Sequence, residues 1–402
     1  MKIKTAIFAA LMVSSMALVG CQQGGSGSGG GSLSMSGRAE RELPAKIQQK
    51  MAAMGMPKTS PIIIRVFKEE SALEVWKQKS NGQYGLIATY EICQWSGKLG
   101  PKFIEGDRQA PEGFYTVRPT QMNPNSNYYL AFNIGFPNAY DAVNGRTGRH
   151  LMVHGACSSS GCYSMTDESI AEIYAFGRDS FRGGQHEFQV QAFPFRMTAA
   201  NMARYRNDAN YSFWRMLKEG YDIFEATKKP PQVDVCEKRY VFNRRSTSGQ
   251  PLSPAGACPA PTQSLPVAYA AYQAEYNSAF SEAINKKSKK PASPSIAGLE
   301  EARLVADWSA RRARGEKVSR TPPSLSSAST ERSGAPDIAP ASANQASKNT
   351  TLPTNASAPA AKPTTEQTQQ SSAVQNSSDQ QTAALVPVQE NKKKSWLGFL
   401  SR

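Results

Sequence analysis

One short stretch of the chain, residues 151–167, carries the residue types of a cysteine-dependent acyl transfer site. It reads LMVHGACSSSGCYSMTD, so His154 is followed by a Gly/Ser-rich turn and then by Cys162, just before residues typical of a helix start. A thiol is only partly ionised at neutral pH, and a helix N-terminus together with a nearby imidazole lowers its pKa. The spacing therefore predicts Cys162 as nucleophile and His154 as its base.

The turn between these two residues offers backbone donors. Gly161 allows the main chain to approach a substrate carbonyl closely. The N–H groups around Ser160 to Cys162 would then form an oxyanion hole, a contribution of about 3 kcal/mol per donor. Gly155 has no side chain that could orient the histidine, so a backbone carbonyl must fix the tautomer of His154.

Two other interpretations of the same stretch stay open. Cys157 and Cys162 could form a structural disulfide. Alternatively, His150, His154, Cys157 and Cys162 could hold zinc, although four ligands within thirteen residues of strand and turn do not match common zinc spacings.

Short strands and a few helices are predicted to position this stretch. β-branched or alternating patterns predict strands at 62–67, 73–77, 84–93, 128–134, 150–154 and 187–193, with an Asn81-Gly82 turn between the second and third. Helical spacing follows an acidic start at 166–169, and further helices are predicted at 201–219, 268–286 and 297–314. The pattern favours a mainly β fold, a mixed sheet or β-sandwich with flanking helices.

The N-terminus predicts export and a lipid anchor. Lys2 and Lys4 precede an apolar run at 6–19 that is too short to span a bilayer. Leu18-Val19-Gly20-Cys21 resembles a bacterial lipobox, in which Cys21 carries diacylglycerol, and the following Gln favours the outer membrane. The alternative is an ordinary signal peptide with an incidental cysteine. The chain is thus expected on the periplasmic side of a membrane, held there by lipid.

Composition divides the rest of the chain. We predict a signal peptide at 1–20, a flexible tether at 21–37, a catalytic domain at 38–245 with its core at 60–195, and a Pro/Gly-rich loop with a helical extension at 246–315. Residues 316–402 are expected to be a disordered tail, because they have too few apolar residues to form a core. Its last residues, 392–400, are basic and apolar, which suits either an anionic membrane surface or a frayed terminus.

Charge and cysteine content narrow the partners. The net charge of +15 suits an anionic polymer such as peptidoglycan or a phosphate-bearing lipid, and export argues against nucleic acid.

If Cys21 is lipidated and Cys162 is a free thiol, four cysteines remain, and they allow three disulfide pairings: Cys93, Cys157, Cys236 and Cys258. Cys236 with Cys258 is the preferred pair, because it would close a Gly/Pro/Ser-rich loop.

Several segments together resemble the L,D-transpeptidase catalytic domain family (YkuD type), and in particular its YafK-like branch. The Ser-X-Gly-Cys motif ends at Cys162, and the similarity extends to residues 91–102, 106–107, 110–115, 132–141 and 145–148. It covers about 60–195. Many relatives have a second histidine where this chain has Ser160, which weakens any inference about the acceptor.

The resemblance implies a mechanism without metal or cofactor. Cys162 would attack the diaminopimelate carbonyl of a peptidoglycan stem peptide to form a thioester, and His154 would take the thiol proton and later activate the acceptor. Gly161 and the Cys162 amide would hold the oxyanion. Arg146 and Gly155 are expected at the substrate, with Arg146 on its carboxylate, although Arg146 could equally be a surface arginine.

Three functions are then possible for the chain. The first is L,D-transpeptidation on an amine acceptor. The second is an amidase that uses water to hydrolyse the link between peptidoglycan and a lipoprotein. Expected protein partners are an envelope lipoprotein or an outer-membrane protein. The third is a non-catalytic lipoprotein that tethers the membrane to peptidoglycan. One acyl-enzyme serves the first two.

Overall fold

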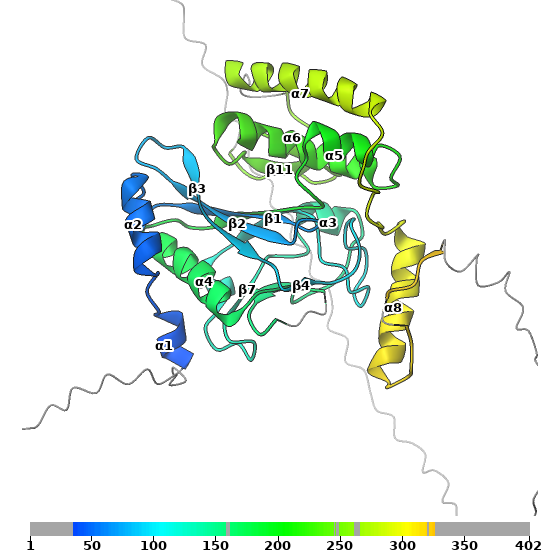
Figure 1. Ribbon diagram of the computed structural model, residues 1–402, viewed down its shortest axis with the longest axis horizontal. Helices are drawn as coiled ribbons and strands as arrows, with labels where there is room; N and C mark the ends of the chain where they lie inside the picture. The colour runs from blue at the N-terminus through cyan, green and yellow to red at the C-terminus, as the bar shows by residue number, and fades with distance from the viewer. Residues whose placement is uncertain are drawn as a thin grey trace, which may run out of the picture. The chain divides into compact units, whose positions relative to one another are not determined.

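The structure is a computed structural model, and it describes residues 35–157, 161–244, 246, 249–260, 266–319 and 321–325 (Figure 1). Cys21 and Ser160 lie outside the described residues, as do the predicted signal peptide, the membrane-binding segment at 392–400 and most of the predicted tail. The expectations for those segments therefore stay predictions.

A central five-stranded sheet has the order β3-β2-β1-β10-β5. Its strands are β1 (Ile62–Phe67), β2 (Ala72–Gln78), β3 (Tyr84–Glu91), β5 (Gly113–Val117) and β10 (Phe188–Phe193). β1 pairs in parallel with β10, and its six residues are all buried. A strand buried on both faces reads as a continuous apolar run, which explains the Ile-Ile-Ile start of β1.

A second five-stranded sheet carries the candidate site and has the order β4-β9-β8-β7-β6. Its strands are short: β4 (Gln94–Trp95), β6 (Met122–Asn123), β7 (Ala131–Asn133), β8 (Met152–His154) and β9 (Tyr163–Ser164). β8 and β9 are parallel neighbours, so the chain leaves His154, makes a turn and returns alongside.

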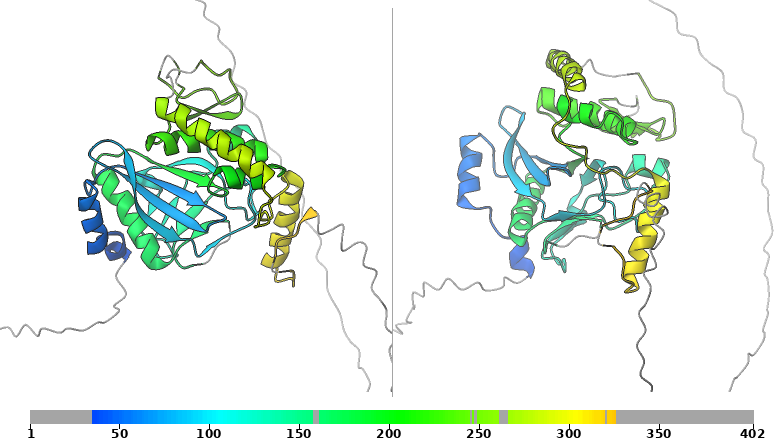
Figure 2. Two further views of the ribbon diagram at one scale, coloured as in Figure 1. Left: turned by 45° about the horizontal axis from the view of Figure 1, so that its top comes forward. Right: turned by 45° about the vertical axis from the view of Figure 1, so that its right-hand side comes forward.

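Helices cover both faces of the central sheet (Figures 1 and 2). α1 (Met35–Ala39), α2 (Ala45–Ala53) and α4 (Asp167–Arg182) lie on the side of the second sheet. α5 (Ala199–Arg204), α6 (Tyr211–Thr227), α7 (Val267–Asn285) and the hairpin of β11 (Val233–Cys236) and β12 (Arg239–Phe242) lie on the other. α3 (Ala139–Val143), a 3-10 turn (Pro119–Gln121) and α8 (Leu299–Ala313) complete the described part.

Two hydrophobic cores correspond to these two sides. One joins α4 and the second sheet to the central sheet through residues such as Phe132, Val153, Tyr163 and Ile173. The other joins α5, α6 and the hairpin to the opposite face through Phe193, Trp214, Leu217 and Tyr240. The expected fold class, a mixed β architecture with flanking helices, is confirmed.

Several predicted elements are shorter than the sequence patterns suggested. Tyr129 and His150 have positive φ angles of 69° and 56°, which end the extended backbone before β7 and β8. The helix predicted at 201–219 is two helices, because Asp208 accepts hydrogen bonds from both the backbone and the side-chain amide of Asn210 and breaks the chain there. Three further parts of the fold were not predicted from the sequence: α2, β5 and the β11–β12 hairpin.

The C-terminal extension packs closely on the domain. Ile296 donates its N–H to the Leu99 carbonyl at 2.8 Å and is fully buried. Glu301, 1 % exposed, forms an ion pair with Lys98. Ala302, Val305 and Trp308 are the buried face of α8. Residues 293–313 therefore act as a strap across the loop at 96–109.

No helix in the described part of the chain is both long and apolar enough to cross a bilayer. This finding concerns the described helices only, and the predicted lipid anchor at Cys21 is not among them.

Candidate active site

The parallel pairing of β8 with β9 brings the two predicted catalytic residues to neighbouring strands. Val153 pairs with Tyr163, and His154 pairs with Ser164. Cys162 therefore lies one residue before the first paired residue of β9. Two residues along a strand span about 7 Å. Because side chains alternate across a strand, the positions of Cys162 and Ser164 share the face of the sheet on which His154 lies.

The Cys162 sulfur lies against the backbone of the strand that carries the histidine. The Met152 N–H donates to Sγ at 3.5 Å, and the thiol reaches the His150 carbonyl at 3.8 Å. Burial raises the pKa of the Cys162 thiol, and the Met152 N–H and the positive charge of Lys102 oppose that rise. The thiol is therefore neutral at rest and needs a base.

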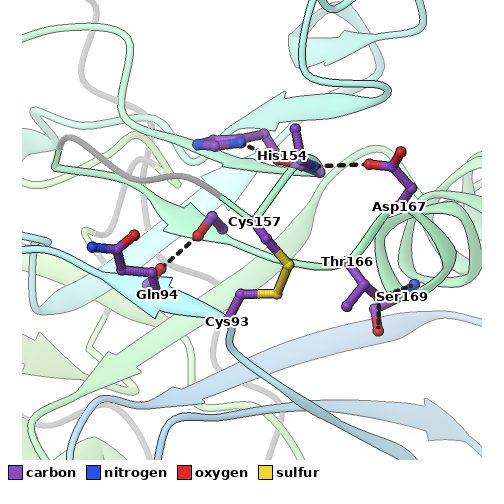
Figure 3. Close-up of a disulfide and its surroundings, with 10 residues drawn as sticks. Cys93, Gln94, His154, Cys157, Thr166, Asp167 and Ser169 are labelled. Carbon is purple, nitrogen blue, oxygen red and sulfur yellow. Dashed lines mark hydrogen bonds between the residues drawn. A yellow bond between two sulfur atoms is a disulfide. The ribbon is translucent and has the colours of Figure 1, made fainter.

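The predicted role of a helix N-terminus at Cys162 is wrong. Cys162 does not directly precede a helix, because β9 intervenes and α4 begins only at Asp167, with Thr166 as its N-cap. The start of α4 instead supports the turn after the histidine, where Asp167 Oδ1 accepts the Ala156 N–H at 2.8 Å (Figure 3).

The tautomer of His154 is fixed as the sequence required. Its Nδ1 lies 2.7 Å from the Gly155 carbonyl oxygen. A carbonyl can only accept, so Nδ1 carries the proton and Nε2 keeps its lone pair. His154 as a whole residue is 4 % exposed, and its ring lies 4.7 Å, centroid to centroid, from the ring of Tyr128. Burial lowers the pKa of His154. A neutral imidazole with an available Nε2 is suited to accept a thiol proton.

Gly155 is a packing position in the structure. A Cβ there would come within 2.6 Å of Asp167 Oδ1 and 2.8 Å of the Tyr128 carbonyl oxygen. Its own N–H donates to that Tyr128 oxygen at 3.0 Å. Gly155 is buried and holds the histidine in place, so we correct its expected role from substrate contact to positioning of His154.

The cysteine next to this turn forms the disulfide that remains once Cys236 is paired with Cys258. Cys157 is bonded to Cys93, with 5.3 Å between their Cα atoms (Figure 3). This overturns the alternative of a Cys157–Cys162 bridge, and Cys162 is outside both disulfides. The other predicted pair, Cys236 with Cys258, is confirmed.

The zinc alternative is also wrong. Among the residues that the structure describes, no three His, Cys, Asp or Glu side chains are grouped so that they could hold a metal ion. Cys157, one of the four proposed ligands, is consumed by its disulfide.

Gly161 has a φ of +107°, a conformation that favours glycine directly before the candidate nucleophile. Its position faces the neighbouring loop, because a Cβ there would lie 3.7 Å from the Cα of Arg108. Ser160, the other predicted contributor to an oxyanion hole, lies outside the described residues.

Lys102 is a site residue that sequence reasoning missed. It is 4 % exposed, and its ammonium donates to Asp107 Oδ1 at 2.5 Å and to the Ile104 carbonyl at 2.9 Å. Asp107 also accepts the Phe103 N–H at 2.8 Å. The charge of Lys102 favours the ionised form of Cys162. The signal available in the sequence was that Lys102 and Asp107 both lie in segments that resemble the family, at 91–102 and 106–107.

Arg146 does not match either of its expected roles. It is 9 % exposed, so it is not a surface arginine. Its guanidinium donates to the buried Asp141 carboxylate at 2.9 Å and lies over the rings of Tyr140 and Phe213 at 4.8 and 4.9 Å. Because the guanidinium is buried against Asp141 and these two rings, we assign Arg146 to packing of the core that contains α6.

The directions of the two pKa shifts predict a pH profile. Activity requires neutral His154, and its lowered pKa places the acid-side midpoint of kcat/KM below pH 6.5. The raised pKa of Cys162 keeps the thiol protonated at neutral pH, so a second rise from thiol ionisation is expected only in alkaline solution. Measuring kcat/KM from pH 4.5 to 9.5 checks both limits, and an acid midpoint above pH 7 would contradict the geometry of His154.

The Cys93–Cys157 bridge should contribute strongly to stability, because it closes a segment with a sequence separation of 64. We expect replacement of both cysteines by serine to lower the free energy of unfolding by about 2–4 kcal/mol in urea titrations. The matched control is the pair Cys236→Ser and Cys258→Ser, separated by 22 residues, which should cost about 1 kcal/mol less. Equal or reversed losses would contradict this account of the bridge.

Comparison with known proteins supports the resemblance. The chain is 47% identical over 208 residues to the protein named "Putative L,D-transpeptidase YafK" in Escherichia coli strain K12, and equally to that of Escherichia coli O157:H7. The match covers 52% of this chain and 82% of each relative. No family model matches the chain.

Two solved structures show weaker similarity. The helical cell shape determining protein Pgp2 of Campylobacter jejuni is 19% identical with a TM-score of 0.28, over 47% of this chain and 79% of that one. Bd1075 of Bdellovibrio bacteriovorus is also 19% identical, with a TM-score of 0.26 over 44% and 76%. Identity over most of the length of the curated relatives is decisive: the chain belongs to the YafK-like L,D-transpeptidase family.

Proposed function

We propose that this protein is a peptidoglycan L,D-transpeptidase that acts through a thioester on Cys162. The observation that carries the proposal is the hydrogen bond from His154 Nδ1 to the Gly155 carbonyl, which leaves Nε2 as a base on the strand beside Cys162. The curated relatives carry the L,D-transpeptidase name, and the substrate class follows from that family.

The first half of the reaction forms the acyl-enzyme. Sγ of Cys162 attacks the diaminopimelate carbonyl carbon of a stem peptide while His154 Nε2 takes the thiol proton. Backbone N–H groups at Gly161 and Cys162 stabilise the oxyanion. The peptide bond then breaks, and the leaving amine takes the proton from His154. The lowered pKa of His154 suits this return of the proton.

The second half transfers the acyl group. An acceptor amine attacks the thioester carbonyl, His154 takes its proton, and the thiol leaves with that proton. Water in place of the amine gives hydrolysis, the amidase outcome. We favour the amine, because the curated relatives carry the L,D-transpeptidase name.

We expect the other segments of the chain to export the enzyme and to anchor it. Signal peptide, tether and catalytic domain are assigned to 1–20, 21–37 and 38–245, the helical extension to 246–315 and the tail to 316–402. A lipid on Cys21 would hold the enzyme on the periplasmic side of the outer membrane, within reach of peptidoglycan.

Digestion of purified sacculi with the protein lacking its predicted lipid anchor tests the proposal. The products are identified by mass spectrometry, and the Cys162→Ala variant is the control. New cross-links support transpeptidation, and released envelope protein supports the amidase. If the sacculi do not change and a thiol-reactive carbapenem forms no adduct on Cys162, the enzyme hypothesis is rejected. Only the hypothesis of a non-catalytic tethering lipoprotein then remains.

A further inference from the structure

The C-terminal strap, residues 293–313, is a part of the fold to which the proposed reaction gives no role. Figure 1 shows its helix α8 beside the two sheets, apart from the layer of α5, α6 and α7. Among the described residues, the two hydrophobic cores described above include none of Ala302, Val305 and Trp308, although these residues form the buried face of α8. The strap contacts the 96–109 loop instead.

The first residues of the strap hold the first half of this loop. The Ile296 N–H donates to the Leu99 carbonyl at 2.8 Å, and the Leu99 N–H donates to the Pro294 carbonyl at 3.3 Å. A Cβ at Gly100 would lie 2.7 Å from Cγ2 of Ile296, so that side chain lies directly on the loop backbone. Hydrogen bonds and close packing therefore fix the loop at Leu99 and Gly100.

A buried ion pair fixes the same loop to the first turn of α8. The side chains of Lys98 and Glu301 are 11 % and 1 % exposed. Burial favours the neutral acid, but hydrogen bonds from Lys98 and from the Ala297 N–H prevail and lower the pKa of Glu301. The carboxylate is therefore charged at neutral pH. Removing one partner of a buried ion pair is strongly destabilising, because the other charge is left buried and unpaired.

Hydrogen bonds continue from this ion pair to the lysine that acts on the candidate nucleophile. The Lys98 N–H donates to Gln109 Oε1 at 2.6 Å, and the Gln109 N–H donates to Asp107 Oδ1 at 3.0 Å. Asp107 is the partner of Lys102, whose charge favours the ionised thiol. A continuous set of contacts thus connects Glu301 with Lys102.

The second half of the loop lies between α8 and the turn before the candidate nucleophile. A Cβ at Gly106 would lie 4.0 Å from the Cβ of Ala306 on α8. Two residues further along the loop, the Cα of Arg108 lies 3.7 Å from the position of a Cβ at Gly161. Burial and the charge of Arg312, in the last turn of α8, lower the pKa of Arg108. A displacement of α8 would therefore be passed through the loop to the turn.

We propose that Glu301 is a positioning residue of the active site, and that the strap it anchors holds the 96–109 loop against the turn at Gly161. In this role the strap keeps Lys102 near the thiol and supports the backbone N–H groups of Gly161 and Cys162 that stabilise the oxyanion. The effect on turnover rests on the proposed function, whereas the support of the turn does not.

Two strap variants and one control test this proposal in the full chain with Cys21→Ser, which removes the predicted lipidation site. Glu301→Ala leaves Lys98 unpaired, and Ile296→Ala removes the side chain that lies on the loop backbone. Glu316→Ala is the matched control, because Glu316 directly follows the strap and pairs with Arg311 at the surface, where both side chains are exposed.

Two measurements are made on each variant. Hydrogen exchange with mass spectrometry follows the amides of 96–109 and 161–165, and steady-state kinetics on a defined stem peptide give kcat and KM. In both strap variants we expect exchange in both segments to become about tenfold faster. We expect kcat to fall about tenfold with KM within about twofold of the parent, because a misplaced site affects the chemical step. The control should match the parent in every measurement.

Two results would overturn the proposal. Unchanged exchange at 96–109 in the strap variants would show that the strap does not hold the loop. Faster exchange at 96–109 with unchanged exchange at 161–165 and unchanged kcat would show that the strap stabilises the fold without positioning the site. Circular dichroism checks folding, and two strap variants protect the test against one that does not fold.

Failure of the proposed function would give a different result. A parent protein that does not turn over stem peptides would reject the proposed reaction. Exchange at 161–165 would still decide whether the strap supports the turn that carries Cys162, because this measurement needs no substrate.

Discussion

Replacing Cys162 with alanine is expected to abolish turnover of muropeptides, lowering kcat by a factor on the order of 10⁴ or more. The thioester cannot form without Sγ, and no other described cysteine can replace it, because Cys93, Cys157, Cys236 and Cys258 are all in disulfides. Product release from a defined stem peptide, followed by mass spectrometry, measures the effect.

The melting temperature of the Cys162→Ala variant is measured as the control for folding. Cys162 is only partly buried, so loss of one sulfur should change the melting temperature by no more than a few degrees. A stable Cys162→Ala protein that keeps activity would contradict the assignment of the nucleophile.

Replacing Gly155 with alanine should give the second largest loss, although the change adds a single methyl group. The new Cβ would lie 2.6 Å from Asp167 Oδ1 and 2.8 Å from the Tyr128 carbonyl, so the backbone at 155 must move. That movement displaces the carbonyl that holds His154 Nδ1. We expect kcat to fall on the order of 100-fold, with a smaller change in KM, because a misplaced base affects the chemical step.

Stability must be measured beside activity for this variant, and overpacking of this kind typically costs about 1–3 kcal/mol. Gly82→Ala is the matched control, since nothing lies within 4 Å of a Cβ at that surface turn and its positive φ makes the substitution strained as well. The control should lose some stability and keep kcat. Full activity in Gly155→Ala would show that the carbonyl is not needed to orient His154.

The local features of the fold were predictable from the sequence. A run of β-branched residues marks β1, and alternation marks β2, because strand patterns report burial on one or both faces. The proposal that Cys162 and His154 act together came from residue types, short spacing and the family resemblance, and the structure places them on neighbouring strands. The tautomer of His154 was also predictable, because a glycine neighbour leaves only a backbone acceptor.

Contacts between distant parts of the chain were not predictable in the same way. Lys98 and Glu301 are 203 residues apart and meet in one buried ion pair, and nothing in either local sequence indicates the other. Asp141 lies only five residues from Arg146, yet its burial, which decides the role of that arginine, depends on tertiary packing. The thiol pKa was misjudged for the same reason, since burial and β9 depend on the assembled sheet.

The most direct measurement of the central claim is the mass of the intact protein during reaction with a defined stem peptide. We predict a transient adduct equal to the acyl part of that peptide, located on the tryptic peptide that contains Cys162 and released by hydroxylamine. Turnover that proceeds without such an adduct, or with an acyl group on another residue, would contradict a Cys162 thioester.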